Sequence, residues 1–204
     1  MSGIKRILNE HTENNIPKYI AATAVFAAGF VLGIAGSFGS GNGTVENVAQ
    51  SIRTTCESVS AGGVDAPKLF WISVWKNLRN CLAIFLGGFS LWLSPLIPGL
   101  LFACGFSYGY TAGFLSANFG SDGFLLVLVS SATAIVIVIP VYAVLSVISF
   151  NNSLKRRRLS NGSKNTAVFA AVFVLVSLLL IPAAAIDAFV VPEIVKQICV
   201  RIVS

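Results

Sequence analysis

The sequence has few charged residues. Asp, Glu, Lys and Arg make up only 11% of its 204 residues, whereas 55% are hydrophobic. Soluble domains carry about 25% charged residues, so this charge content is too low to cover a folded soluble chain of this size. The apolar residues form runs of roughly 20, the length at which a helix crosses a bilayer. The composition therefore excludes an ordinary soluble domain and predicts a membrane protein.

The sequence also lacks the residue patterns of enzymes. Its single histidine, His11, lies in a polar N-terminal stretch, and no metal-binding or phosphate-binding motif is present. An intramembrane aspartyl protease needs two acids, and only Asp187 lies well inside an apolar run. The four cysteines form no CxxC pair. We expect no enzyme activity, metal or cofactor, and a disulfide between Cys56 and Cys199 stays open.

Five apolar runs predict a single all-α membrane domain, a bundle of about five transmembrane helices with short amphipathic helices at the interface. The predicted spans are residues 19–38, 77–94, 99–118, 124–150 and 166–190. The predicted polar segments are an amphipathic N-terminus at 1–18, a loop at 39–76, a turn at 119–123, a basic loop at 151–165 and a tail at 191–204. The N-terminal segment fits an interfacial helix and a frayed tail equally well.

Three prolines predict breaks in these helices. Pro95 and Pro98 bracket a tight turn between the second and third spans, and Pro140 should kink the fourth. Whether the second and third spans cross fully or form a re-entrant pair stays open.

Three glycines in the third span predict a packing surface. Gly105, Gly109 and Gly113 are four residues apart and therefore share one helix face. Each glycine weakens a helix by about 1 kcal/mol relative to alanine, but in a membrane small residues let two helix backbones approach closely. We favour packing within the bundle, although the stripe also permits a homodimer. The candidate partners are Gly29 and Gly33 in the first span or Gly87 and Gly88 in the second.

Four polar residues lie in or beside the spans. Asp187 is a candidate functional site because ionisable groups inside membranes usually serve a function. The interpretation slightly favoured is that it caps the helix end or pairs with a basic residue such as Arg79. Asn77, Arg79 and Asn80 open the second span, where anchoring at the lipid headgroups is favoured over hydrogen bonds between helices.

One loop carries most of the clustered positive charge. Its basic residues are Lys155, Arg156, Arg157, Arg158 and Lys164. The positive-inside rule predicts that this loop is cytoplasmic. An odd number of spans then places the N-terminus in the cytoplasm and the C-terminus outside. The basic run is short and close to two spans, so we expect it to set topology and contact anionic lipid rather than nucleic acid.

Several stretches, taken in order, resemble the stage II sporulation protein M family. They are EHTENNIPKYI before the first span, KNLRNCLAIFLGGFSLWLSPLIPGLLFACGFSYGYTAGFL across the central pair, IVIVIPVYAVLSVISF in the fourth span and IPAAAIDAFVVPEIV near the end. Their order and spacing carry the resemblance over nearly the whole chain. The acid of the last stretch is Asp187, where the family more usually has glutamate.

The resemblance implies a non-catalytic scaffold in the mother-cell engulfing and septal membrane during sporulation. Such a scaffold would anchor two peptidoglycan-degrading proteins, stage II sporulation proteins D and P, during forespore engulfment. Protein D is a lytic transglycosylase, and protein P is an amidase and endopeptidase. The 39–76 loop, the outer helix ends and the tail would bind them. The alternative is a small transporter or channel subunit, with Asp187 and the break near Pro95 and Pro98 lining a path.

Overall fold

The structure is a computed structural model that describes residues 15–39, 42–60, 65–89, 92–158 and 163–203, and every regular element in these ranges is helical. The all-α prediction is confirmed. The elements are α2 (Ile16–Phe38), α3 (Asn42–Ser60), α4 (Ala66–Gly87), α5 (Leu96–Thr133), the π-helical turn η1 (Ala134–Val138), α6 (Ile139–Arg158), α7 (Ser163–Ser177), α8 (Leu180–Phe189) and α9 (Val191–Val203).

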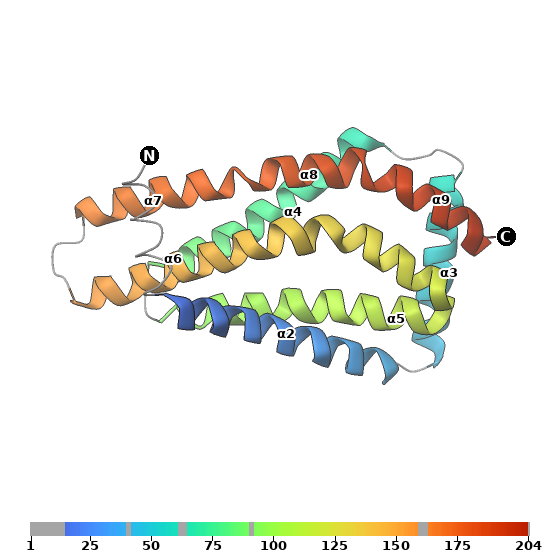
Figure 1. The fold of residues 1–204 in the computed structure, drawn as a ribbon, viewed down its shortest axis with the longest axis horizontal. Helices are drawn as coiled ribbons and strands as arrows, with labels where there is room; N and C mark the ends of the chain where they lie inside the picture. Colours follow the sequence, from blue (N-terminus) through green and yellow to red (C-terminus); the bar gives the residue numbers. More distant parts are fainter. Residues whose placement is uncertain (1–14, 40–41, 61–64, 90–91, 159–162, 204) are drawn as a thin grey trace.

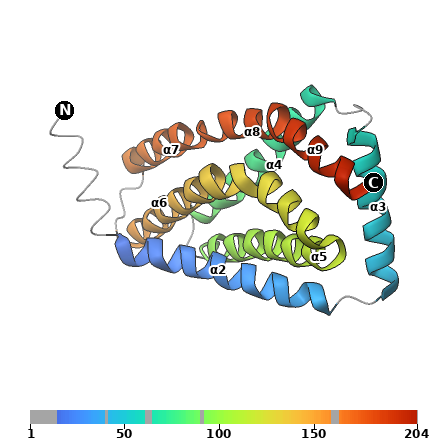
Figure 2. The ribbon, with the colours of Figure 1, turned by 45° about the vertical axis from the view of Figure 1, so that its right-hand side comes forward.

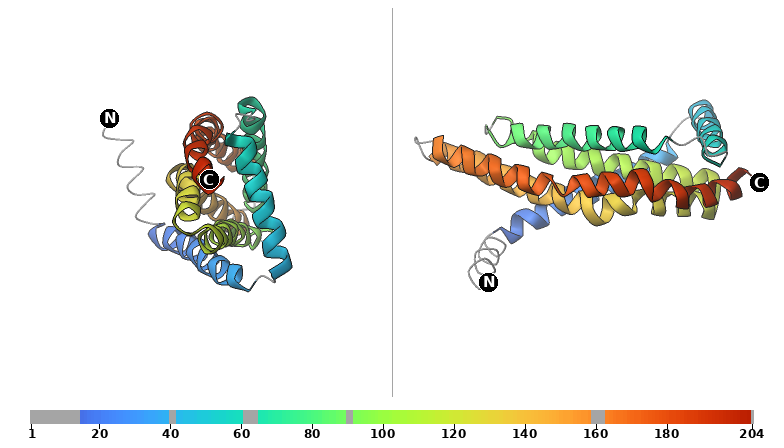
Figure 3. Two further views of the ribbon diagram at one scale, coloured as in Figure 1. Left: turned by 90° about the vertical axis from the view of Figure 1, so that its right-hand side faces the viewer. Right: turned by 90° about the horizontal axis from the view of Figure 1, so that it is seen from above.

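Most of the helices run along one long axis, and α3 crosses one end of the bundle (Figures 1 and 3). We call this end the α3 end. The chain reverses there inside α5, at Gly120, whose φ of 59° and ψ of −133° are not helical. Position 120 has open space around it, so glycine is favoured here by its backbone conformation and not by crowding. This reversal lies within the predicted polar turn at 119–123.

Three stretches among the described residues are long and apolar enough to cross a membrane, namely Ile16–Phe38, Leu96–Leu154 and Ala167–Val200. The second has 59 residues. As one straight helix it would extend about 90 Å, roughly three times the hydrocarbon thickness of a bilayer, and the reversal at Gly120 divides it. The predicted membrane class is therefore supported. The count of about five spans stays a prediction, because α4 is not among these stretches.

The position of α4 corrects the predicted second span at 77–94. The helix begins at Ala66 and ends at Gly87, so its first half lies in a segment predicted to be loop. Lys68 and Lys76 interrupt the apolar residues of that half, so a search for long apolar runs does not detect it. The turn before α5 correspondingly comes earlier than predicted. Pro95 directly precedes α5, and Pro98 lies in its first turn, where the missing N–H of a proline costs little.

The predicted break at Pro140 takes the form of a wide helical turn. The π-helical residues Ala134–Val138 come immediately before α6, and helical structure continues on both sides of them. A proline removes one backbone donor and crowds the preceding turn. A π-helical turn is one way in which a helix accommodates such a defect without ending.

Two apolar clusters form the interior. The bundle core includes Ile84, Leu101, Val138, Tyr142, Leu145, Phe169, Phe173 and Leu180. The smaller cluster, which we call the cap core, lies at the α3 end and consists of Cys56, Leu115, Leu126, Val127 and Cys199. It joins α3 and α9 to the two arms of α5 on either side of Gly120 (Figure 2). Much of the segment predicted as a loop and most of the predicted tail are therefore helices that pack on the bundle.

Candidate functional site

The glycines that the sequence singled out lie between α2 and α5. A Cβ atom added at any of four positions would overlap a backbone carbonyl oxygen of the opposite helix. The pairs are Gly29 with Phe102, Gly33 with Phe106, Gly105 with Phe26 and Gly109 with Phe30. A Cβ at Gly113 would overlap the side chain of Ser37. We call this contact the glycine seam, and it is the close backbone packing that small residues permit in membranes.

The other two candidate glycines do not join the seam. A Cβ at Gly87 would meet the side chain of Ile97, and a Cβ at Gly88 would meet the side chain of Phe169. The seam therefore joins the first and third predicted spans within one chain. Gly87 and Gly88 instead let the end of α4 pack against α5 and α7.

Asn77 and Asn80 face into the bundle, which corrects the predicted anchoring at the headgroups. The Tyr142 hydroxyl of α6 donates a buried hydrogen bond of 3.2 Å to Oδ1 of Asn77. The Asn80 amide lies 4.0 Å from the Cys104 sulfur of α5. Residues three apart share a helix face, so both amides reach the interior of the bundle together. Asn77 is buried and Asn80 is half-buried, so both side chains contact partners inside the protein.

Asp187 lies half-buried on α8 and has partners on two other helices. The Thr133 side chain of α5 and the charge of Lys76 on α4 both act electrostatically on its carboxylate. The Lys76 ammonium also lies 5.5 Å from the centre of the Tyr108 ring. Lys76 and Arg79 are both exposed, and the basic residue whose charge acts on Asp187 is Lys76.

These side chains form one group, which we call the polar cluster. Its members are Lys76, Asn77, Asn80, Cys104, Tyr108, Thr133, Tyr142 and Asp187. Thr133 and Tyr142 were not predicted as site residues, although both are polar residues inside the fourth apolar run. Lys76 was not predicted because the predicted span began one residue later. The cluster ties α4, α5, α6 and α8 together.

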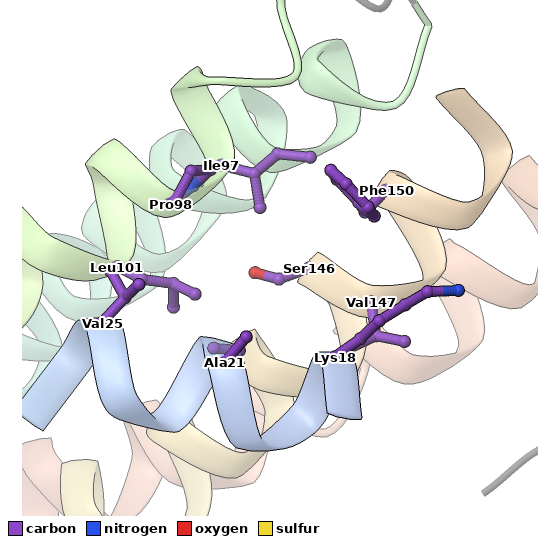
Figure 4. A pocket seen from close by; sticks show the side chains of 10 residues that line it. Lys18, Ala21, Val25, Ile97, Pro98, Leu101, Ser146, Val147 and Phe150 are labelled. Carbon is purple, nitrogen blue, oxygen red and sulfur yellow. The ribbon is translucent and has the colours of Figure 1, made fainter. Parts of the chain in front are cut away.

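A separate cavity of about 150 Å³ lies toward the end of the bundle that is far from α3, between α2, α5 and α6 (Figure 4). Its walls are mainly apolar, and the Ser146 hydroxyl points into it without a hydrogen-bond partner. At its edge the Lys18 ammonium donates a 2.9 Å hydrogen bond to Asn15 and a further bond to Asn151 of α6. The Asn151 amide also donates to Asn15, at 2.8 Å. These polar residues connect the start of α2 to α6.

The α3 end presents a polar helix face. Cys56 points inward, whereas Gln50, Thr54 and Ser58 are exposed and four residues apart on one side of α3. The Arg53 guanidinium lies 5.9 Å from the centre of the Phe119 ring of α5. The arrangement holds a polar, hydrogen-bonding surface across the end of an apolar bundle.

The basic residues lie at the opposite end of the bundle. α6 continues through Lys155, Arg156 and Arg157 to Arg158, and Lys164 lies at the start of α7. Their side chains are outside the part of the structure that is described, as are residues 1–14 of the predicted amphipathic N-terminus. The helical course of α6 nevertheless separates this positive charge from α3 by the length of the bundle (Figure 1).

The family model described as stage II sporulation protein M matches residues 22–192, from the first turns of α2 to the start of α9. The chain belongs to the stage II sporulation protein M family. The resemblance noted in the sequence is thereby confirmed. No curated protein and no solved structure matches the chain. The matched region contains the glycine seam and the polar cluster, and family membership together with the apolar helices identifies a membrane protein of sporulation.

Proposed function

We propose that this stage II sporulation protein M family member is a non-catalytic scaffold that anchors peptidoglycan-degrading proteins during forespore engulfment. Family membership supports the sporulation setting. The observation that carries the proposal is the position of α3, a polar helix that α9 and α5 hold across one end of the bundle. A fixed polar surface next to a membrane is suited to docking soluble proteins.

The charge distribution supports an orientation in which α3 faces outward. Lys155 to Arg158 extend from the end of α6 that is far from α3. Positive loops stay in the cytoplasm, so the α3 end would lie outside, where peptidoglycan is found. In this orientation α3 and α9 are available to stage II sporulation proteins D and P in the engulfing membrane.

Co-purification with proteins D and P in mild detergent with native lipid tests the proposal. The discriminating variant combines Gln50→Lys, Thr54→Lys and Ser58→Lys, because these side chains are exposed and leave the cap core untouched. Ser121→Lys is the control, since it adds a charge at an exposed position of the same end but not on α3. We expect wild type and control to retain the hydrolases and the triple variant to lose at least one. Wild type that retains neither contradicts the scaffold role.

The polar cluster supports a second candidate, a small transporter or channel subunit. Asp187 and Thr133 place a half-buried carboxyl group and a buried hydroxyl group in the bundle, where conduits carry such groups. In a conduit, Asp187→Asn abolishes flux through reconstituted vesicles while the protein remains folded. A scaffold shows no flux in wild type, so the flux measurement separates the two functions.

A further inference from the structure

Two cysteines that are 143 residues apart in the sequence meet at the α3 end. The Cys199 sulfur of α9 lies 2.6 Å from the Cys56 sulfur of α3. This distance is closer than unbonded sulfur atoms pack, and the two residues are not bonded in the structure. The side chains therefore already have the mutual approach that a disulfide of about 2.05 Å needs.

The surroundings of the pair favour a structural bond over a reactive thiol. Cys56 and Cys199 are only 3% and 1% exposed, and they pack with Leu115, Leu126 and Val127. Reactive cysteines are accessible and lie near positive charge, which stabilises the thiolate. Burial in the apolar cap core works against both conditions. A disulfide, in contrast, is uncharged and suits such a site.

The other two cysteines provide an internal comparison. Cys81 belongs to the bundle core, whereas the Cys104 sulfur lies 4.0 Å from the Asn80 amide. They lie in the interior of the bundle and are free thiols. The chain therefore contains one pair of facing cysteines at the α3 end and two separate thiols inside the bundle.

We propose that Cys56 and Cys199 form a disulfide that fixes α3 onto α9. The two thiols give up two protons and two electrons, and they form one sulfur–sulfur bond. The acceptor is the disulfide of a thiol–disulfide oxidoreductase or of a small-molecule thiol, which is reduced to two thiols. Because both sulfurs are buried once α9 has docked, the exchange takes place before that docking is complete.

The bond has a consequence for topology that is independent of the scaffold proposal. Disulfides persist in oxidising compartments and are rare in the cytoplasm. A disulfide in the cap core therefore places the α3 end outside the cytoplasm whichever proteins bind there. It closes a loop that contains most of the bundle and holds the polar face of α3 in a fixed position.

The test counts free thiols in the full-length protein in its native membranes. Membranes are quenched in acid, which stops thiol exchange, then denatured and treated with a maleimide that carries a polymer tag. We expect two of the four cysteines to be tagged without a reductant and all four after reduction. Tagging of all four without reduction overturns the proposal, and the measurement needs no variant to fold.

Two further readouts assign the bond. Cys56→Ser frees Cys199, so we expect three tags without reduction, whereas Cys81→Ser should leave one. Trypsin should release residues 54–68 joined to residues 197–201, with a mass two hydrogens below the sum of the separate peptides. Linkage of either cysteine to Cys81, to Cys104 or to another molecule contradicts the assignment. These results do not depend on whether proteins D and P bind, so the two proposals fail separately.

Discussion

The glycine seam and the cap core join helices by opposite means. At the seam, α2 and α5 approach so closely that their glycines meet backbone carbonyl groups and leave no room for a side chain. In the cap core, α3 and α9 are separated from α5 by the side chains of Leu115, Leu126 and Val127. The seam lies between long apolar helices, whereas the cap core supports a helix with a polar outer face.

This difference follows from the surroundings of each interface. Lipid tails are as apolar as leucine, so burying an apolar side chain between membrane helices gains little, and close packing has to stabilise the seam. In the orientation proposed above, water is available at the α3 end, so burial of apolar side chains would stabilise the cap core by about 25 cal/mol per Å². The seam should therefore tolerate almost no added volume, while the cap should depend on its side chains and its cross-link.

The largest expected effect comes from filling the seam. Gly109→Leu should destabilise the bundle by about 3 kcal/mol or prevent folding, because even its first side-chain carbon overlaps the Phe30 carbonyl oxygen. The measurement is the thermal unfolding midpoint and the monodispersity of the detergent-purified protein. Gly99→Leu is the matched control, since position 99 is in the same helix with open space around it. Equal behaviour of the two variants contradicts the seam.

The next effect concerns the cap. Replacement of both Cys56 and Cys199 by serine should lower stability by about 2–4 kcal/mol, the usual contribution of a native disulfide. Thermal unfolding is followed with and without reductant. A reductant should lower the unfolding midpoint of wild type and leave that of the double variant unchanged. If the reductant leaves the unfolding midpoint of wild type unchanged, no cross-link contributes to stability.

An interface could be predicted from the sequence only where residues close together in the sequence indicate it. The spacing of Gly105, Gly109 and Gly113 fixes a common face in any helix, so the sequence pointed to the seam and named α2 among its partners. The cysteine pair left no such signal. Cys56 and Cys199 lie in segments interpreted as a loop and a tail, and only the packing of α3 against α9 brings them together.

The polar cluster shows how an error in a helix boundary becomes an error in a site. Hydropathy placed the start of the second span at residue 77, which left Lys76 outside the membrane helix. Because α4 begins at Ala66, Lys76 lies at the middle of this helix, and its charge acts on Asp187 of α8. Arg79 seemed the better partner only because it lay inside the predicted span. Burial of Asn77 and Asn80 likewise depends on how α4 is rotated, which composition does not determine.

The third prediction concerns how much the polar cluster contributes to stability, compared with the seam and the cap. Asp187→Leu should cost about 1–3 kcal/mol, because it places an apolar side chain opposite the buried Thr133 hydroxyl, whereas the Lys76 ammonium is exposed. Asp187→Asn should cost less, since an amide oxygen still accepts the hydrogen bond from Thr133. Thermal unfolding in detergent ranks the two. If leucine is as stable as wild type, the cluster contributes only to function.

The smallest expected effect is at the exposed edge of the cap. Arg53→Gln removes the cation that lies over the Phe119 ring, a contact worth about 0.5–1 kcal/mol at an exposed site. A double-mutant cycle with Phe119→Leu isolates the pair from the packing of the ring in the cap core. The coupling should fall in high salt, because exposed charges are screened, whereas the seam contains no charge for salt to act on. A salt-independent coupling would mean that the edge of the cap is held by packing alone, like the seam.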